Sequence, residues 1–127
     1  MRGIIPAKII EYFSHECNLE PCEMFDLIGG TSIGGIISLG IGCTKNKTEP
    51  LVNKDSIVNL LRNAGPKIFS TSKIRGLLKN LTDRCRYSKE GIENVCMETF
   101  LDLSLLDVMP GCQVIVTAVK RLMQQGE

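Results

Sequence analysis

The segment at residues 25–40, FDLIGGTSIGGIISLG, constrains the possible folds more than any other part of the chain. A short apolar run enters a cluster of glycines around Thr31 and Ser32, and a second apolar run leaves it. The first run, MFDLIG at 24–29, is short and followed by glycine, which predicts a buried strand. The second run, Ile33–Gly42, is apolar around nearly its whole circumference, which predicts a buried helix.

The residues before this segment predict a helix and then a loop. Proline is favoured in the first turn of a helix, and Pro6 stands near the start of an amphipathic stretch. The apolar side chains of this stretch repeat at helical spacing: Ile5, Ile9, Tyr12 and Phe13. Asn18 and Pro21 then break the pattern, which predicts a loop ahead of the strand.

The residues after the segment predict two further helices. The polar stretch 44–54 predicts a surface loop, and Asp55 is a good N-cap for the apolar pattern that follows it. Gly65 and Pro66 are predicted to end that helix, because this pair disfavours its continuation. A second helix, rich in basic residues, is predicted at 72–81.

The last part of the chain predicts one more helix and one more strand. Ser88 is a good N-cap, and the residues after it form one apolar stripe: Ile92, Val95, Cys96, Thr99 and Phe100. The β-branched run QVIVTAV at 113–119 predicts a central parallel strand. Strands separated by helices imply a layered α/β fold, and the 127 residues fit a single domain, residues 1–127. The small residues Gly34, Gly35 and Ser38 would let the buried helix lie close against the sheet.

Charge and cysteine content argue against several classes of function. Fifteen Lys and Arg against 14 Asp and Glu give a net charge of +1, which indicates neither nucleic-acid binding nor attraction to an acidic membrane surface. No apolar run reaches the roughly 18 residues of a membrane span, and the first residues become charged too soon for a signal peptide. The six cysteines contain no CxxC pair and His15 is the only histidine, so we expect reduced thiols and no metal site.

The glycine cluster allows three interpretations. Residues 29–34 match the opening G-x-x-x-x-G of a phosphate-binding loop, but Gly35 and Ile36 stand where that loop needs Lys and then Ser or Thr. A tight packing turn, with Ser32 as a simple helix cap, is the second interpretation. The third is a serine nucleophile, because residues 30–34 form G-x-S-x-G between an apolar strand and an apolar helix, the context that this motif requires.

A nucleophile at Ser32 would stand at a sharp turn and at the N-terminus of a helix. The helix dipole and the free backbone amides there favour a developing oxyanion, and the amide of Ile33 is the expected donor. Gly30 and Gly34 would keep the neighbouring backbone and the helix clear of the serine. No histidine follows Ser32, and His15 is expected to be an exposed residue at the end of the first helix, so a Ser-His-Asp triad is not predicted.

The absence of such a histidine favours a family that uses a serine nucleophile without histidine. The segments RGIIP and FDLIGGTSIGGIISLG resemble one such family, the patatin-like phospholipases. In that family a D-G-G-G-x-R-G run opens the first helix, G-T-S-x-G carries the nucleophile, and a later D-G-G or D-G-A supplies the aspartate of a Ser-Asp dyad. Residues 87–119 also look like the family's segment between nucleophile and distal aspartate. The resemblance implies a three-layer α/β/α sandwich with a mainly parallel central sheet, which would be incomplete in this chain.

The resemblance also assigns roles to individual positions. Ser32 would be the catalytic nucleophile, and the nucleophile elbow would comprise Gly30, Thr31 and Gly34. The oxyanion hole would be partial and made of backbone groups: Arg2, Gly3 and Ile33. None of the aspartates is followed by glycine: Asp26, Asp55, Asp83, Asp102 and Asp107. The dyad aspartate is therefore expected to lie outside this chain, and the chain is expected to be truncated at both ends.

The implied activity is hydrolysis of a phospholipid or neutral-lipid ester through an acyl-enzyme, with no metal or other cofactor. The implied setting is the cytoplasm or peripheral contact with a lipid surface, where the basic stretch 67–86 would touch anionic headgroups or form a solvated helix face. Loss of one oxyanion donor costs roughly 10²–10³ in rate, so we expect this chain alone to be inactive or very weak. The alternative is a non-catalytic pseudoenzyme or a module that binds lipid or a partner.

Overall fold

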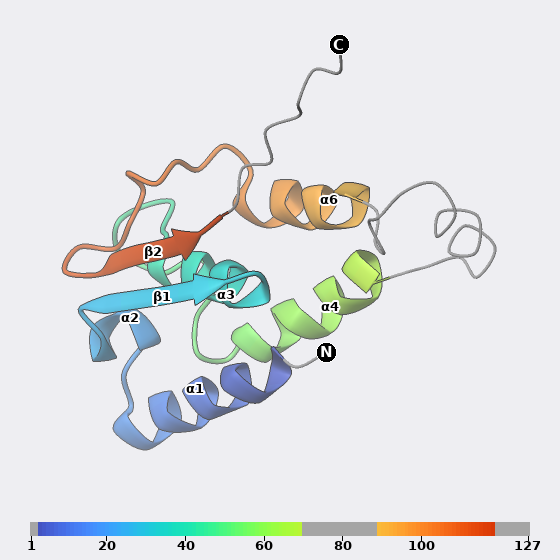
Figure 1. The fold of residues 1–127 in the computed structure, drawn as a ribbon. Coiled ribbons are helices and arrows are strands. Elements are labelled where there is room, and N and C mark those ends of the chain that lie inside the picture. The colour runs from blue at the N-terminus through green and yellow to red at the C-terminus, as the bar shows by residue number, and fades with distance from the viewer. Residues whose placement is uncertain (1–2, 70–88, 119–127) are drawn as a thin grey trace, which may run out of the picture.

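The computed structural model describes residues 3–69 and 89–118, whose arrangement Figure 1 shows. The described residues form five helices and two strands: α1 (Ile4–Cys17), α2 (Pro21–Met24), β1 (Leu27–Thr31), α3 (Ile33–Gly42), α4 (Ile57–Phe69), α6 (Lys89–Phe100) and β2 (Gln113–Thr117). The predicted helix at 72–81, the predicted cap Ser88 and the candidate oxyanion residue Arg2 lie outside the described residues.

The two strands form a small parallel sheet. They pair in register from Leu27 opposite Gln113 to Thr31 opposite Thr117. Parallel neighbours need a crossover connection, and here α3, α4 and α6 lie between the two strands in sequence. The predicted fold class is confirmed, because helices and a parallel sheet together are compatible with an incomplete layered α/β fold.

One face of the sheet is covered by α3, which lies along both strands in Figure 1. Gly35 and Gly42 make this close approach possible. A Cβ atom on Gly35 would lie 2.9 Å from Cγ1 of Val116, and one on Gly42 would lie 2.3 Å from Cγ2 of Val114. Ser38 is buried and donates its hydroxyl to the Gly34 carbonyl at 2.8 Å, so its polar group is satisfied inside the helix.

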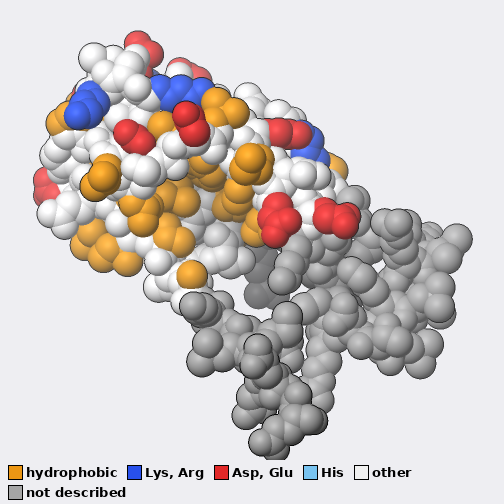
Figure 2. All heavy atoms as spheres, turned by 90° about the horizontal axis from the view of Figure 1, so that it is seen from above, with side chains coloured by type: hydrophobic (Ala, Val, Ile, Leu, Met, Phe, Trp, Pro, Cys, Tyr) orange, Lys and Arg blue, Asp and Glu red, His pale blue; other side chains and the backbone are white. Residues whose placement is uncertain are grey.

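The opposite face of the sheet is exposed among the described residues. Leu27 is 54% exposed and Ile115 is 53% exposed, although their composition predicts buried strands. The difference arises because side chains alternate between the two faces of a strand and α3 covers only one face. Figure 2, viewed from the side of β2 and α6, shows hydrophobic side chains gathered on the surface. The second helical layer of the expected sandwich is not among the described residues.

The hydrophobic core lies between α1, α3 and α4, and the loop before α4 contributes one side chain to it. Its buried members are Ala7, Ile37, Ile41, Val52, Ile57, Val58 and Leu61. Ile28 of β1 and Ile33 of α3 pack against this cluster while remaining partly exposed. Full burial of an aliphatic side chain contributes about 1.5–3 kcal/mol, so this cluster fixes α3 behind the sheet.

Helix α1 has the predicted spacing but presents the apolar residues of the predicted stripe outward. The exposed side chains are Ile5, Ile9, Tyr12 and Phe13. The helix instead buries Ala7 and Ser14, because these small side chains face the neighbouring elements. Asn18 then ends the helix in the left-handed conformation at φ 52°, in agreement with the predicted break.

The first strand begins later than the sequence predicts. Residues that the pattern assigns to loop and strand form the short helix α2, whose Glu20 and Glu23 make a reciprocal capping box. Asp26 therefore precedes β1 and is not part of it, which corrects the prediction that it belongs to the strand.

Helix α4 continues through Gly65 and Pro66, so the prediction that this pair ends the helix is wrong. A proline inside a helix costs roughly 3 kcal/mol, which tertiary packing has to offset. Here α6 approaches the last turn of α4 closely, since a Cβ on Gly91 would lie 2.4 Å from the Lys67 carbonyl oxygen. This packing keeps the segment helical beyond the proline.

The cap before α4 is also different from the predicted one. The Ser56 amide donates to Oδ1 of Asn53 at 3.0 Å, and the Asn53 amide donates to Oγ of Ser56 at 3.1 Å. The side chains of Asn53 and Ser56 thus each accept the backbone amide of the other residue ahead of the helix, and Asp55 is not the cap. Within residues 3–69 and 89–118, no helix has both the length and the apolar character needed to cross a bilayer.

Candidate active site

The candidate site lies at the carboxyl end of β1, where a single residue separates strand from helix. That residue is Ser32, with φ 55° and ψ −125°. Residues other than glycine rarely adopt a positive φ, and such a conformation costs about 1–3 kcal/mol. The side chain is exposed and its hydroxyl does not cap α3. A serine hydroxyl is therefore held outward at a strained turn.

Gly30 makes this turn sterically possible. A Cβ atom at this position would lie 2.1 Å from the carbonyl oxygen of Gly34 and 2.2 Å from its carbonyl carbon. Both atoms belong to the backbone of the first turn of α3, which cannot rotate away as a flexible side chain can. Any larger residue at position 30 would push the helix away from the strand and open the turn.

The glycines that follow Ser32 have different surroundings. A Cβ on Gly34 would meet no atom of the described residues within 4 Å, so its side is open in this structure. Gly35 is the tightly packed one, because its α-carbon faces Val116 of β2. The G-x-S-x-G pattern does not include Gly35, and only the extra glycine in GGTSIGG hints at its packing role.

The N-terminus of α3 presents backbone amides beside Ser32. The amides of Gly35 and Ile36 donate to the Ser32 carbonyl at 2.9 and 3.4 Å. The amides of Ile33 and Gly34 open the helix, where backbone donors have no carbonyl within the helix to bond. Together with the positive end of the helix dipole, these donors suit an anion that forms in front of the serine.

The structure brings Gly3 against the residue that follows Ser32. A Cβ atom on Gly3 would lie 2.9 Å from both Cγ1 and Cγ2 of Ile33. Two of the three candidate oxyanion residues are thus neighbours in space although 30 positions separate them in sequence. Position 2, the third candidate, lies outside the described residues.

The described aspartates nearest the sheet do not lie beside Ser32. Asp26 precedes the first residue of β1, and a five-residue strand spans about 16 Å. Asp107 precedes β2, where its Oδ2 accepts the Ser104 amide at 2.7 Å and its carbonyl accepts the Thr44 amide at 2.9 Å. Both belong to the amino end of the sheet, so neither is placed as a base for the serine.

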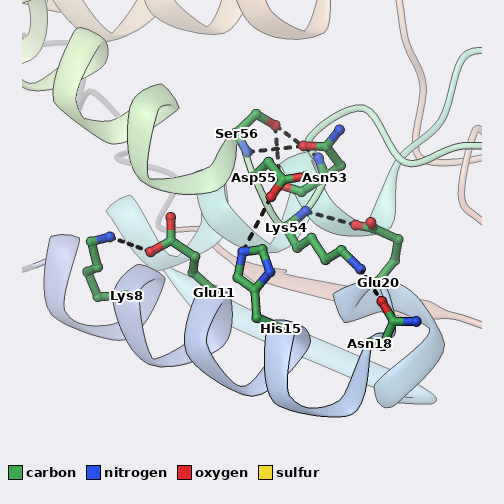
Figure 3. Close-up of polar contacts among 9 residues, drawn as sticks. All are labelled: Lys8, Glu11, His15, Asn18, Glu20, Asn53, Lys54, Asp55 and Ser56. Atoms are coloured by element: carbon green, nitrogen blue, oxygen red, sulfur yellow. Dashed lines mark hydrogen bonds and ion pairs between the residues drawn. The ribbon is translucent and has the colours of Figure 1, made fainter.

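His15 is engaged elsewhere. Figure 3 shows it extending from α1 toward Asp55, with Nε2 3.3 Å from Oδ1 of that residue. His15 is exposed, as the sequence predicts, and lies 12 residues along the helix from Gly3. At 1.5 Å per residue, His15 stands about 18 Å from the Gly3 end of α1. This distance separates it from the turn at Ser32.

Three buried cysteines gather at the amino end of the sheet and are free thiols. Burial raises the pKa of Cys22, and the neighbouring Cys112 raises it further. Burial likewise raises the pKa of Cys43, with contributions from Asp107 and Cys112. Among the described residues, no group of three or more His, Cys, Asp or Glu side chains is arranged to hold a metal ion.

Comparison with known proteins indicates a relationship over part of the chain. No protein-family model matches it. Over 79 residues the chain is 33% identical to Patatin-17 of Solanum cardiophyllum and 33% identical to Patatin-T5 of Solanum tuberosum. It is 30% identical over 79 residues to a protein of Solanum tuberosum named probable inactive patatin-3-Kuras 1.

These alignments cover 57% of this chain and 20–21% of the relatives. The chain therefore spans about a fifth of the length of the curated relatives that it matches. The similarity supports, at modest identity, a patatin-like relationship for the matched part of the chain.

Proposed function

We propose that this chain carries the nucleophile-bearing part of a patatin-like lipid acyl-ester hydrolase, with Ser32 as the nucleophile. The observation that supports the proposal is the exposed side chain of Ser32 at φ 55°, between a parallel strand and the N-terminus of a buried helix. A simple packing turn gives no reason to hold a serine in a conformation that glycine adopts at lower cost. The resemblance of G-T-S-x-G to the phospholipase family supplies the reaction class.

In the proposed reaction, Oγ of Ser32 attacks the ester carbonyl carbon while a base removes the hydroxyl proton. The carbonyl electron pair moves to its oxygen, and the resulting oxyanion faces the backbone amide of Ile33 and the backbone at Arg2 and Gly3. Collapse of the intermediate breaks the bond to the alcohol, which leaves with the proton. Water then hydrolyses the acyl-enzyme and restores the serine. The base is proposed to be an aspartate outside this chain.

The substrate that we propose is a phospholipid or a neutral-lipid ester, reached by peripheral contact with a lipid surface. Residues 1–127 are proposed to form a single partial domain of the hydrolase. No metal or cofactor enters the proposed steps, because Ser32, the helix amides and a carboxylate base supply the nucleophile, the oxyanion donors and the proton acceptor.

A fluorophosphonate probe tests the nucleophile directly, because it reacts with activated serines. Because the proposed base lies outside this chain, we expect the wild-type chain to be modified slowly, at Ser32, as located by peptide mass mapping. The Ser32→Ala variant should lose this labelling. Ser104→Ala is the matched control, since Ser104 is also exposed but lies in a turn at the other end of the sheet. A sample with a cooperative melting transition and no labelling at Ser32 would contradict the proposal.

A non-catalytic lipid-binding or partner-binding module is the second candidate. The observation that favours it is the position of Asp26 and Asp107, which lie at the end of the sheet opposite Ser32. A nucleophile without a base is a weak one. The same labelling experiment separates the two candidates, because a folded and unlabelled wild type supports the module.

A further inference from the structure

Ile33 contributes to the candidate site with two different groups. Its backbone amide opens α3 beside Ser32, as described above. Its side chain points to another part of the molecule, where it packs on the hydrophobic core and against Gly3 at the start of α1. One residue thus joins the N-terminus of α3 to the N-terminus of α1.

The contact between Ile33 and Gly3 leaves no free space. A Cβ on Gly3 would lie 2.9 Å from Cγ1 and 2.9 Å from Cγ2 of Ile33, and 3.6 Å from its Cβ. Both γ-carbons branch directly from Cβ, and β-branched side chains are stiff at χ1. Ile33 therefore cannot accommodate a larger neighbour by a small rotation, and one of the two helix ends would have to move.

The glycine at position 3 is needed for space and not for backbone conformation. Its φ of −62° and ψ of −19° lie in the right-handed helical region, which every residue adopts easily. Gly3 is buried, and its carbonyl accepts the amide of Ala7 at 3.3 Å, so α1 holds it in place. Close approach of the Ile33 side chain is thus the structural reason for a glycine here.

We propose that Ile33 is a positioning residue, whose side chain rests on Gly3 and thereby aims its own amide at the point in front of Ser32. This inference rests on the proposed function and deepens it, because it assigns a task to the variable residue that follows the nucleophile. The task is to fix the distance between the two helix ends that carry the candidate oxyanion donors. Displacement of such donors by about 1 Å is enough to lower a rate by about 10²-fold.

The variants that test this role follow from the contacting atoms. Gly3→Ala adds the carbon that collides with Ile33, and Ile33→Ala removes both γ-carbons that it would meet. The double variant Gly3→Ala/Ile33→Ala has room for the new methyl group. Ile33→Val is the conservative variant, because valine keeps both γ-carbons and loses only Cδ1. Ile9→Ala is the control, since Ile9 is an exposed isoleucine on α1.

The decisive readout is the rate constant of fluorophosphonate labelling at saturating probe, measured apart from the final extent of labelling. We expect Gly3→Ala and Ile33→Ala each to lower the rate constant about tenfold or more, with the final extent unchanged. The labelling rate constant of the double variant should be higher than the value obtained by multiplying the two single effects. That of Ile33→Val should stay within about twofold of wild type. A merely structural role would lower the fraction of labelled protein and leave the rate constant unchanged.

Backbone amide resonances provide a second readout that does not require reactivity. The Ser32 and Ile33 amide peaks in a ¹H–¹⁵N correlation spectrum should move in Gly3→Ala and return toward their original positions in the double variant. If wild type is not labelled, the proposed function fails, and these peaks alone decide the positioning role. Should Gly3→Ala fail to fold, recovery of a cooperative melting transition in the double variant supports the contact. Single effects that simply add, or amide peaks that stay unmoved, overturn the inference.

Discussion

The two ends of the β1–β2 sheet are built in opposite ways. At the carboxyl end, Ser32 is exposed, adopts a positive φ and leaves its hydroxyl without a capping bond. At the amino end, the Gln113 amide donates to the Asp26 carbonyl at 2.8 Å, and a side-chain oxygen of Asp107 accepts a loop amide. The carboxyl end thus carries a strained serine beside the free amides of a helix N-terminus, while hydrogen bonds from loop and strand amides close the amino end.

The loop that follows α3 at the amino end is also held by hydrogen bonds. Thr44, which follows α3 at the amino end, is 1% exposed, and its hydroxyl holds the loop after it. That hydroxyl donates to the Glu49 carbonyl at 2.6 Å and accepts the Lys47 amide at 3.0 Å. A strained residue persists only where its surroundings hold it, and at the carboxyl end the close approach of Gly30 to the first turn of α3 holds Ser32. The comparison therefore predicts that substitutions have different consequences at the two ends.

Gly30→Ala should have the largest effect. The new methyl group would lie 2.1 Å from a backbone oxygen of α3, so we expect destabilisation at or above the upper end of the roughly 1–3 kcal/mol typical of overpacking. Chemical denaturation measures this free energy. Gly34→Ala is the matched control, because nothing within 4 Å opposes its methyl group and alanine is about 1 kcal/mol better than glycine in a helix. Equal losses in the two variants would refute the steric account of the turn.

Thr44→Val should have the next largest effect on the unfolding free energy, and it tests the amino end of the sheet. The substitution keeps the shape of the side chain but leaves the Glu49 carbonyl and the Lys47 amide without their partner. A typical intramolecular hydrogen bond contributes about 0.5–1.5 kcal/mol net. Loss of these two bonds should therefore lower the unfolding free energy by about 1–3 kcal/mol. Thr48→Val in the same loop is exposed and should change it by less than about 0.5 kcal/mol. A similar loss for both threonines would remove the distinction.

Ser32→Gly should stabilise the chain by about 1 kcal/mol, because glycine adopts a positive φ without strain. Ser32→Ala keeps the Cβ atom and should leave the unfolding free energy close to that of wild type. The difference between these two variants, measured by thermal or chemical denaturation, isolates the backbone strain at the turn. A glycine variant no more stable than the alanine variant would mean that the turn stores no strain.

Titration of the buried thiols should have the smallest effect of all on the unfolding free energy at neutral pH. In alkali this effect should grow. Burial, aided by Asp26, raises the pKa of Cys112, and burial raises those of Cys22 and Cys43. A raised folded-state pKa means that the native state keeps a proton which the unfolded chain releases. The resulting stability is fully present below the ordinary thiol pKa of about 8.5 and is lost as pH rises through the folded-state values.

Two measurements test the thiols. The unfolding free energy should be flat near neutral pH and decline above about pH 8.5. Iodoacetamide at pH 8 should modify the exposed Cys17 well before Cys43, with the sites located by mass mapping. Equally fast modification of both cysteines would show that the amino end is open to solvent.

Local patterns were sufficient to predict the types of most described elements. The apolar run at 33–42 predicts its helix with the correct bounds, since no polar face competes with burial. The β-branched run 113–119 predicts a central parallel strand. The structure confirms a parallel strand at Gln113–Thr117, although among the described residues it pairs with β1 alone and is not central. The G-x-S-x-G spacing between two apolar runs predicts a strand-to-helix turn at Ser32, and the structure has that turn there.

Predictions failed where distant residues decide. Gly65 and Pro66 end a helix in isolation, but contact with α6 carries α4 past them. The cap assigned to Asp55 belongs to Asn53 and Ser56, a choice among neighbouring polar residues that local preference does not settle. The outward face of α1 could not be foreseen either, because an apolar stripe identifies a helix but not the side that its neighbours cover.

By itself the sequence determined that a strand meets a buried helix at Ser32, because apolar runs and glycine spacing act over a few residues. Only the tertiary structure decided that Gly3 lies against Ile33 and that Asp26 and Asp107 stand at the other end of the sheet. Contacts between residues 30 positions apart depend on how whole helices pack, and side-chain volumes at those contacts leave no periodic signal in the chain.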